Sequence, residues 1–178
     1  ICIVSCSKSD DSTSVVAENY MNMKAGSSWN YEVINNTLPA STSLYSLNST
    51  NRDSSINRKN YHVYVNSSNG SSEYYYVSGN DYYTFQSLPA ALGGSKVENL
   101  YLKAGAAVGN SWSQTYNITY NSIPLAVTIT HKIDEKGISR TVNGISYNNA
   151  IHVSTGISVA GIPPTALTSD IDYYYAPD

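Results

Sequence analysis

Apolar and polar residues alternate with a period of two along most of the chain from Asn19 onward, as they do in half-buried β-strands. β-branched and aromatic residues occupy the apolar positions, and Asn, Gly, Ser and Pro separate the segments. The alternation predicts strands over residues 28–35, 60–65, 73–78, 81–86, 97–102, 111–120, 125–134, 138–142, 146–155 and 170–176. No apolar stripe of helical period extends beyond about two turns, so little helix is expected.

Short turn signals join several of these segments into hairpins. Asn69-Gly70 and Asn143-Gly144 each separate two alternating segments, and Glu135-Lys136-Gly137 separates a third pair. We therefore expect an all-β fold built from antiparallel meanders. The meanders would form a curved open sheet, a half-barrel or a sandwich.

A sequence pattern that occurs twice in the chain predicts that this fold has two related halves. Two stretches read apolar-Lys-Ala-Gly and precede a Ser-Trp pair that opens a predicted strand: Met23-Lys24-Ala25-Gly26 before Ser28-Trp29, and Leu102-Lys103-Ala104-Gly105 before Ser111-Trp112. Each copy is followed further along by three consecutive tyrosines, at 74–76 and 173–175. We expect a single β domain over residues 19–178, with halves at about 19–95 and 96–178.

Both cysteines of the chain, Cys2 and Cys6, lie within its first six residues. Two cysteines at one terminus neither cross-link a fold nor form a metal site alone. Cys6 follows an apolar run and the small residue Ser5, an order that resembles the end of a bacterial lipoprotein signal peptide. The resemblance implies lipidation of Cys6, a signal-peptide remnant over residues 1–5, and a flexible lipidated tether over residues 6–18.

Landmarks along the rest of the chain are also similar to uncharacterised Bacteroides-type surface lipoproteins. They are the tether Ser7-Lys8-Ser9-Asp10-Asp11, the Lys-Ala-Gly and Ser-Trp elements, the stretch from Thr141 to Val153, and the closing Tyr173-Tyr174-Tyr175-Ala176-Pro177. The resemblance implies a β-fold held by a lipid at the outer membrane or cell surface. It implies no catalytic residues.

Composition and motifs narrow the chemistry further. Charged residues make up 13% of the chain, and its 10 Lys and Arg are spread thinly, so we expect no nucleic-acid binding. His62, His131 and His152 lie in three separate predicted strands, where we expect them to be partly exposed. Asp170 and Asp172 are expected to be a solvated pair. Without a recognisable nucleophile, base or metal cluster, the sequence predicts a non-enzymatic protein with no cofactor and no metal site.

The aromatic residues are the remaining functional signal, because the chain has 17 tyrosines and one phenylalanine. Alternation in a strand directs Tyr74 and Tyr76 to one face and Tyr75 to the other, and likewise Tyr173 and Tyr175 against Tyr174. These six rings are candidates for stacking on a sugar or a peptide. The alternative is that they pair across strands and stabilise the sheet.

Two functions of different classes are compatible with these features. The first is a lipid-anchored binding module for an extracellular ligand, either a carbohydrate or an envelope protein. The second is a carrier of lipid or other apolar cargo in a cavity of the curved sheet. An exposed tyrosine row would favour the first, and a closed apolar cavity would favour the second.

Overall fold

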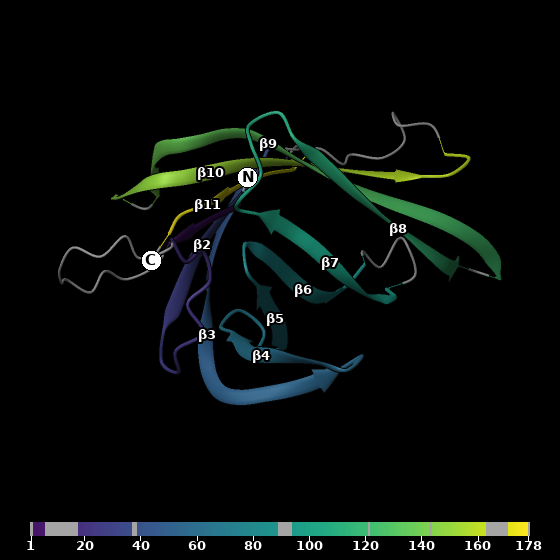
Figure 1. The fold of residues 1–178 in the computed structure, drawn as a ribbon, viewed down its shortest axis with the longest axis horizontal. Helices are drawn as coiled ribbons and strands as arrows, with labels where there is room; N and C mark the ends of the chain where they lie inside the picture. The colour runs from purple at the N-terminus through teal and green to yellow at the C-terminus, as the bar shows by residue number, and fades with distance from the viewer. Residues whose placement is uncertain are drawn as a thin grey trace.

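The computed structural model describes residues 2–5, 18–36, 39–88, 94–120, 122–142, 144–162 and 171–177 (Figure 1). The strands are β1 (Cys2–Ser5), β2 (Ser28–Asn35), β3 (Ser41–Ile56), β4 (Lys59–Asn66), β5 (Ser72–Ser78), β6 (Asp81–Ser87), β7 (Lys96–Lys103), β8 (Ser111–Tyr120), β9 (Ile123–Val142), β10 (Ile145–Val159) and β11 (Ile171–Tyr175). Within these ranges no helix is long and apolar enough to cross a membrane. The described residues form strands and no helix, so the expected all-β fold is confirmed, with antiparallel pairing everywhere except between β1 and β11.

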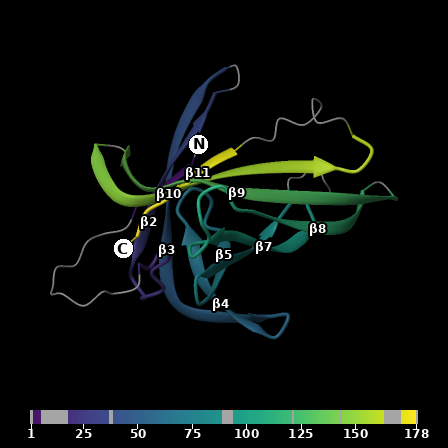
Figure 2. The ribbon, with the colours of Figure 1, turned by 45° about the horizontal axis from the view of Figure 1, so that its top comes forward.

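The strands form one curled, 11-stranded sheet in the order β7-β6-β5-β4-β3-β2-β1-β11-β10-β9-β8. Strands β2 to β7 make a group of six antiparallel strands that curls into a half-barrel, and β8 to β11 make a second antiparallel group of four. Strand β1 joins the groups, antiparallel to β2 and parallel to β11. Figure 2 shows the long β9–β10 pair running across the β2–β3 hairpin.

Side chains connect the two edge strands, β7 and β8, where a backbone ladder would otherwise be needed. The Trp112 indole donates to the Leu100 carbonyl at 2.7 Å, and the Gln114 amide oxygen accepts the Leu100 N–H at 2.5 Å. The Tyr116 hydroxyl donates to the Glu98 carbonyl at 2.6 Å. These bonds occupy edge groups of β7 that would otherwise be open to another strand.

The turns before β2 and β8 have the same geometry, which relates the two halves. Gly26 and Gly109 both adopt a φ of 87°, a conformation that favours glycine, and each lies three residues before a tryptophan. Equivalent backbone bonds tie each turn to the next strand: Gly26 N–H to Ser49 O and Ser49 N–H to Ser27 O in the first half, and Gly109 N–H to Ile133 O and Ile133 N–H to Asn110 O in the second. Ser49 and Ile133 therefore hold equivalent positions.

The way the strands group in the structure differs at two places from the segments expected from the sequence. Strand β7 pairs with β6, so the change from one group to the other falls between Lys103 and Ser111 and not at residue 95. Residues 2–5, expected to be a signal-peptide remnant, form β1 between β2 and β11. Cleavage before Cys6 would remove this strand.

One strand was missed and one local expectation was wrong. The 16-residue strand β3 was not predicted. The hairpin expected at Glu135-Lys136-Gly137 does not form, because β9 continues through these residues. Gly137, at a φ of 71°, is the extra residue of a β-bulge, opposite the step from Ala150 to Ile151 of β10. The hairpin expected at Asn69-Gly70 is confirmed by the β4–β5 pairing. The strands expected on either side of Asn143-Gly144 pair as β9 and β10, and Asn143 itself lies outside the described residues.

The main core lies inside the curl and draws on both groups of strands. It contains the fully buried Trp29, Leu47 and Tyr64 of the first group and Ile133, Ile151 and Val153 of the second. Trp112 is only partly buried at the edge of this core. The halves are thus packed on each other, and the space left between them is lined by side chains from both.

Candidate functional site

A cavity of about 220 Å³ opens between the two groups of strands on the inner face of the curl. Its walls are Tyr31, Tyr45, Glu73, Tyr75, Thr84, Gln86, Asn99, Tyr101, Ile129, His131, Thr155, Ile157, Ile171, Tyr173 and Tyr175. Alternation in each strand directs every second side chain to this face, so pairs such as Tyr173 and Tyr175 reach the cavity together.

The cavity tyrosines are held by ring contacts with one another. Tyr31 and Tyr45 are stacked, with ring centroids 4.7 Å apart and an angle of 1° between their planes. Tyr173 and Tyr175 are also stacked, at 6.0 Å and 13°. Tyr101 lies between the halves, 5.3 Å from the Tyr175 ring. Fixed rings of this kind offer a ligand a preformed aromatic surface.

Burial controls the ionisation of these phenols. Desolvation raises the pKa of Tyr31, Tyr75 and Tyr101 well above the usual tyrosine value. Their hydroxyls therefore stay protonated at physiological pH, so each can both donate and accept a hydrogen bond.

One lining residue, Glu73, is a carboxylate whose oxygens are both held by neighbours. The Asn66 side-chain amide donates to Oε1 at 2.7 Å, and the Tyr75 hydroxyl donates to Oε2 at 3.0 Å. These donors fix the orientation of the carboxylate. The cavity lining thus includes one carboxylate and no Lys or Arg.

His131 lies at the wall of the cavity and is only 2% exposed. Its Nε2 is 3.0 Å from Asn99 Oδ1 and its Nδ1 is 2.8 Å from Thr155 Oγ1. Since an amide oxygen only accepts, Nε2 carries the hydrogen and Nδ1 accepts from the threonine hydroxyl. Burial lowers the pKa of His131 to about 4, so the ring is neutral at pH 7.

The structure separates the six tyrosines that the sequence singled out. Tyr75, Tyr173 and Tyr175 line the cavity. Tyr74 and Tyr76 point to the opposite face of β5, where the Lys59 ammonium lies 5.5 Å from the Tyr76 ring centroid.

Tyr174 also points away from the cavity, to the outer face of β11. It is stacked on His152 at 4.4 Å, and the Arg140 guanidinium lies 4.0 Å from its ring centroid. Cys6 and Asp170 lie outside the described residues.

Three further tyrosines and a histidine of the cavity were not predicted as site residues. Tyr31 and Tyr101 lie in strands whose alternation was recognised, but alternation alone does not reveal which strands face each other across the curl. Tyr45 lies in β3, which was not predicted. His131 was interpreted as a partly exposed strand residue, whereas it is buried.

A smaller recess of about 90 Å³ adjoins the cavity at the stacked pair Tyr31 and Tyr45, which line both. Its other walls include Leu44 and Ile145, which are 60% and 55% exposed. A ligand longer than the cavity could therefore continue past the stacked rings.

Comparison of the chain with protein-family models, with curated proteins and with solved structures gives no match. Among the described residues, no group of three or more His, Cys, Asp or Glu side chains is placed to hold a metal ion.

Proposed function

We propose that the protein is a binding module whose tyrosine-lined cavity holds a neutral saccharide unit. The single observation that carries this proposal is the lining itself, in which aromatic faces alternate with hydrogen-bonding groups. A sugar ring has an apolar C–H face, which packs on tyrosine, and a rim of hydroxyls, which need donors and acceptors. Asn99, Gln86 and Glu73 supply such partners from separate strands.

The size of the cavity favours a small ligand. Its volume of about 220 Å³ lies below the ~300–1,000 Å³ typical of sites for drug-sized molecules. One ring fits such a space better than a long alkyl chain. The recess beyond Tyr31 and Tyr45 would hold the next unit of an oligosaccharide.

Charge favours a saccharide over the alternative, a lipid or fatty-acid carrier. A fatty acid brings a carboxylate, which the Glu73 carboxylate would repel in a site without Lys or Arg. A purely apolar cargo would displace water from Glu73 and Asn99 and leave their remaining hydrogen-bonding positions unfilled.

We also propose that a lipid on Cys6 attaches the module to the outer membrane or cell surface. The apolar run, Ser5, Cys6 and the polar tether that follows support this location. A diacylglycerol thioether together with an amide-linked acyl chain would give the stable attachment that a single chain does not. Mass spectrometry of the native protein tests it: a lipidated Cys6 at the N-terminus is expected, and a free thiol there would contradict it.

A fluorescence titration tests the cavity. In a Trp29→Phe variant, Trp112 is the remaining tryptophan, and its ring lies 5.5 Å from that of His131 in the cavity wall. We expect a saturable change with a neutral oligosaccharide from a panel, and none with a fatty acid. A response to fatty acids alone would favour the carrier.

Two matched variants locate the binding. Tyr173→Ser removes a half-buried ring from the cavity, and Tyr83→Ser removes a half-buried ring from the opposite face of β6. Loss of one stacking ring is expected to weaken binding about tenfold in the first variant only. Equal loss in both would place the ligand elsewhere.

A further inference from the structure

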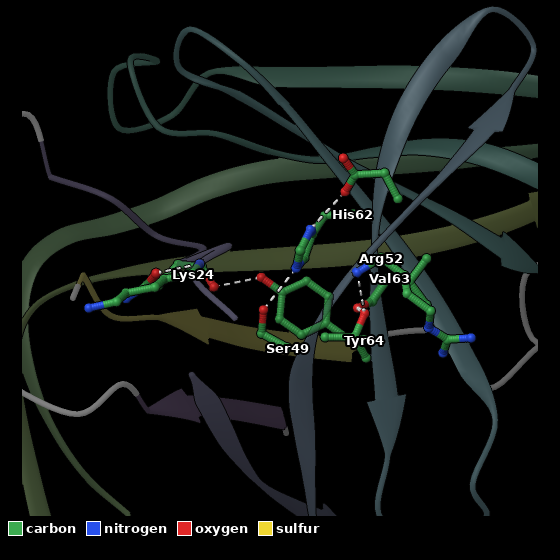
Figure 3. A network of polar contacts seen from close by, with 9 residues as sticks. Lys24, Ser49, Arg52, His62, Val63 and Tyr64 are labelled. Atoms are coloured by element: carbon green, nitrogen blue, oxygen red, sulfur yellow. Dashed lines mark hydrogen bonds and ion pairs between the residues drawn. The ribbon is translucent and has the colours of Figure 1, made fainter. Parts of the chain in front are cut away.

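Ser49, His62 and Asp53 form a hydrogen-bonded triad on β3 and β4. Figure 3 shows Ser49 and His62 side by side. The Ser49 hydroxyl oxygen is 2.8 Å from His62 Nε2. His62 Nδ1 is 2.9 Å from Asp53 Oδ1. Since a carboxylate only accepts, Nδ1 carries the hydrogen, and Nε2 is left to accept the serine proton. This is the order of groups that activates a serine nucleophile, and it is recognised by geometry and not by sequence position.

A β-bulge in β3 makes this geometry possible. The pairing of β3 with β4 shifts between Ser49, opposite Tyr64, and Asp53, opposite His62. Within the bulge, the Thr50 hydroxyl donates to the Val63 carbonyl at 2.6 Å and accepts the Arg52 N–H at 3.1 Å. The extra residues bring Asp53 directly across from the imidazole. Bulges that redirect a side chain in this way are common beside active sites.

The other half of the protein shows that packing does not require a serine here. Ser49 is 6% exposed, and the equivalent position holds Ile133, which is fully buried. A buried hydroxyl costs free energy unless it is hydrogen-bonded, whereas isoleucine contributes apolar burial. The first half thus has a hydrogen-bonded polar side chain at the position where the second half has a buried apolar one.

We propose that Ser49 is a nucleophile that accepts the acyl group of a small ester, with His62 as its general base and Asp53 as the residue that positions the imidazole. The Ser49 oxygen forms a bond to the ester carbonyl carbon, and its proton passes to His62 Nε2. The bond to the alcohol breaks, and the alcohol leaves with that proton. Water then attacks the acyl-serine by the same route, releasing the acid and restoring Ser49.

The burial of the three groups limits the substrate. The turn over residues 24–27 bonds through Gly26 and Ser27 to the backbone of Ser49, and little of the serine is exposed. The imidazole side chain is 12% exposed, whereas the Asp53 side chain is 64% exposed. A small acyl group can reach such a site and a bulky one cannot. Ser49, His62 and Asp53 are not among the residues that line the cavity, so this activity does not depend on saccharide binding.

Methanesulfonyl fluoride, a small reagent for activated serines, tests the proposal on the full-length protein. Attack by Ser49 forms the oxygen–sulfur bond, releases fluoride and passes the proton to His62, and mass spectrometry of the digested protein locates the adduct. We expect labelling at Ser49, none in Ser49→Ala, and labelling slowed about 100-fold or more in Asp53→Asn and His62→Gln. Because Asp53 is exposed, Asp53→Asn is expected to keep the wild-type thermal unfolding midpoint.

A matched control is His152→Gln. His152, like His62, contacts a carboxylate. Both of its ring nitrogens face carboxylates, Asp172 at 2.9 Å and Glu135 at 3.3 Å, so neither nitrogen is left to activate a serine. Ser49 labelling is expected to be unchanged in this variant. Absence of label at Ser49 in the wild type, or equal labelling rates in wild type and a folded Asp53→Asn variant, would overturn the proposal.

Discussion

Replacing His131 with glutamine is expected to lower by one the number of protons that the protein takes up when it unfolds in acid. Burial lowers the pKa of the folded-state imidazole from the usual 6.5 to about 4. Between these values the unfolded chain binds a proton that the folded protein does not, so the free energy of unfolding falls as the pH falls. The contribution of the neutral His131 to the free energy of unfolding is complete above pH 6.5 and is lost by about pH 4. At about 1.4 kcal/mol for each pH unit, the loss amounts to roughly 3 kcal/mol.

The glutamine side chain can still donate to Asn99 and accept from Thr155, but it does not titrate. It loses the ring contact with Trp112, so we expect a cost of about 1–3 kcal/mol at pH 7. Urea unfolding followed by circular dichroism, at several pH values from 4 to 7.5, measures both effects. The stability advantage of the wild type over the variant should shrink as the pH falls below 6.5 and should vanish or reverse by about pH 4.

Ile129→Val is the control for this series. It shortens another buried residue of the cavity wall and leaves His131 in place, so we expect a loss of about 0.5–1.5 kcal/mol at every pH. A difference between wild type and His131→Gln that stays constant from pH 4 to 7.5 would refute the assignment of a buried, neutral histidine.

Other consequences can be measured separately. Glu73→Gln removes the cavity charge and should improve binding of an acidic sugar relative to its neutral counterpart about tenfold, by fluorescence titration; an unchanged ratio would place Glu73 outside the binding site. Gln114→Ala removes a bond to Leu100 and should cost about 1 kcal/mol and speed hydrogen exchange of the Leu100 amide, whereas the outward-facing Ser113→Ala should not. A chain lacking residues 1–5 should retain its unfolding midpoint if the mature protein begins at Cys6; loss of the cooperative transition would show that β1 is required.

The sequence predicts most of the strands because most of them bury one face. The expected ranges 28–35 and 111–120 agree with β2 and β8 to the residue. Alternation does not predict strand β3, because its 16 residues are mainly Ser, Thr and Asn and include few apolar side chains. It becomes a strand because β2 and β4 supply backbone partners on its two sides, a tertiary effect that local alternation does not contain.

The candidate sites depend on pairings between distant segments. Alternation correctly separates Tyr75 from Tyr74 and Tyr76, but it does not reveal that Tyr75 faces the same cavity as Tyr173. Asp53 lies opposite His62 only because a bulge forms in β3, the long strand that the sequence pattern does not show. Turn chemistry is ambiguous in the same way, because a glycine such as Gly137 suits a bulge as well as a hairpin.

Nuclear magnetic resonance of tyrosine rings labelled with ¹³C tests the saccharide-binding cavity most directly. The ligand is the neutral oligosaccharide that changes Trp112 fluorescence, and single Tyr→Phe variants assign the resonances. We predict saturable shifts for the rings that line the cavity: Tyr31, Tyr45, Tyr75, Tyr101, Tyr173 and Tyr175. Tyr76 and Tyr174, on the opposite face of the sheet, should not shift. Shifts confined to Tyr76 and Tyr174, with the cavity rings unchanged, would contradict the account.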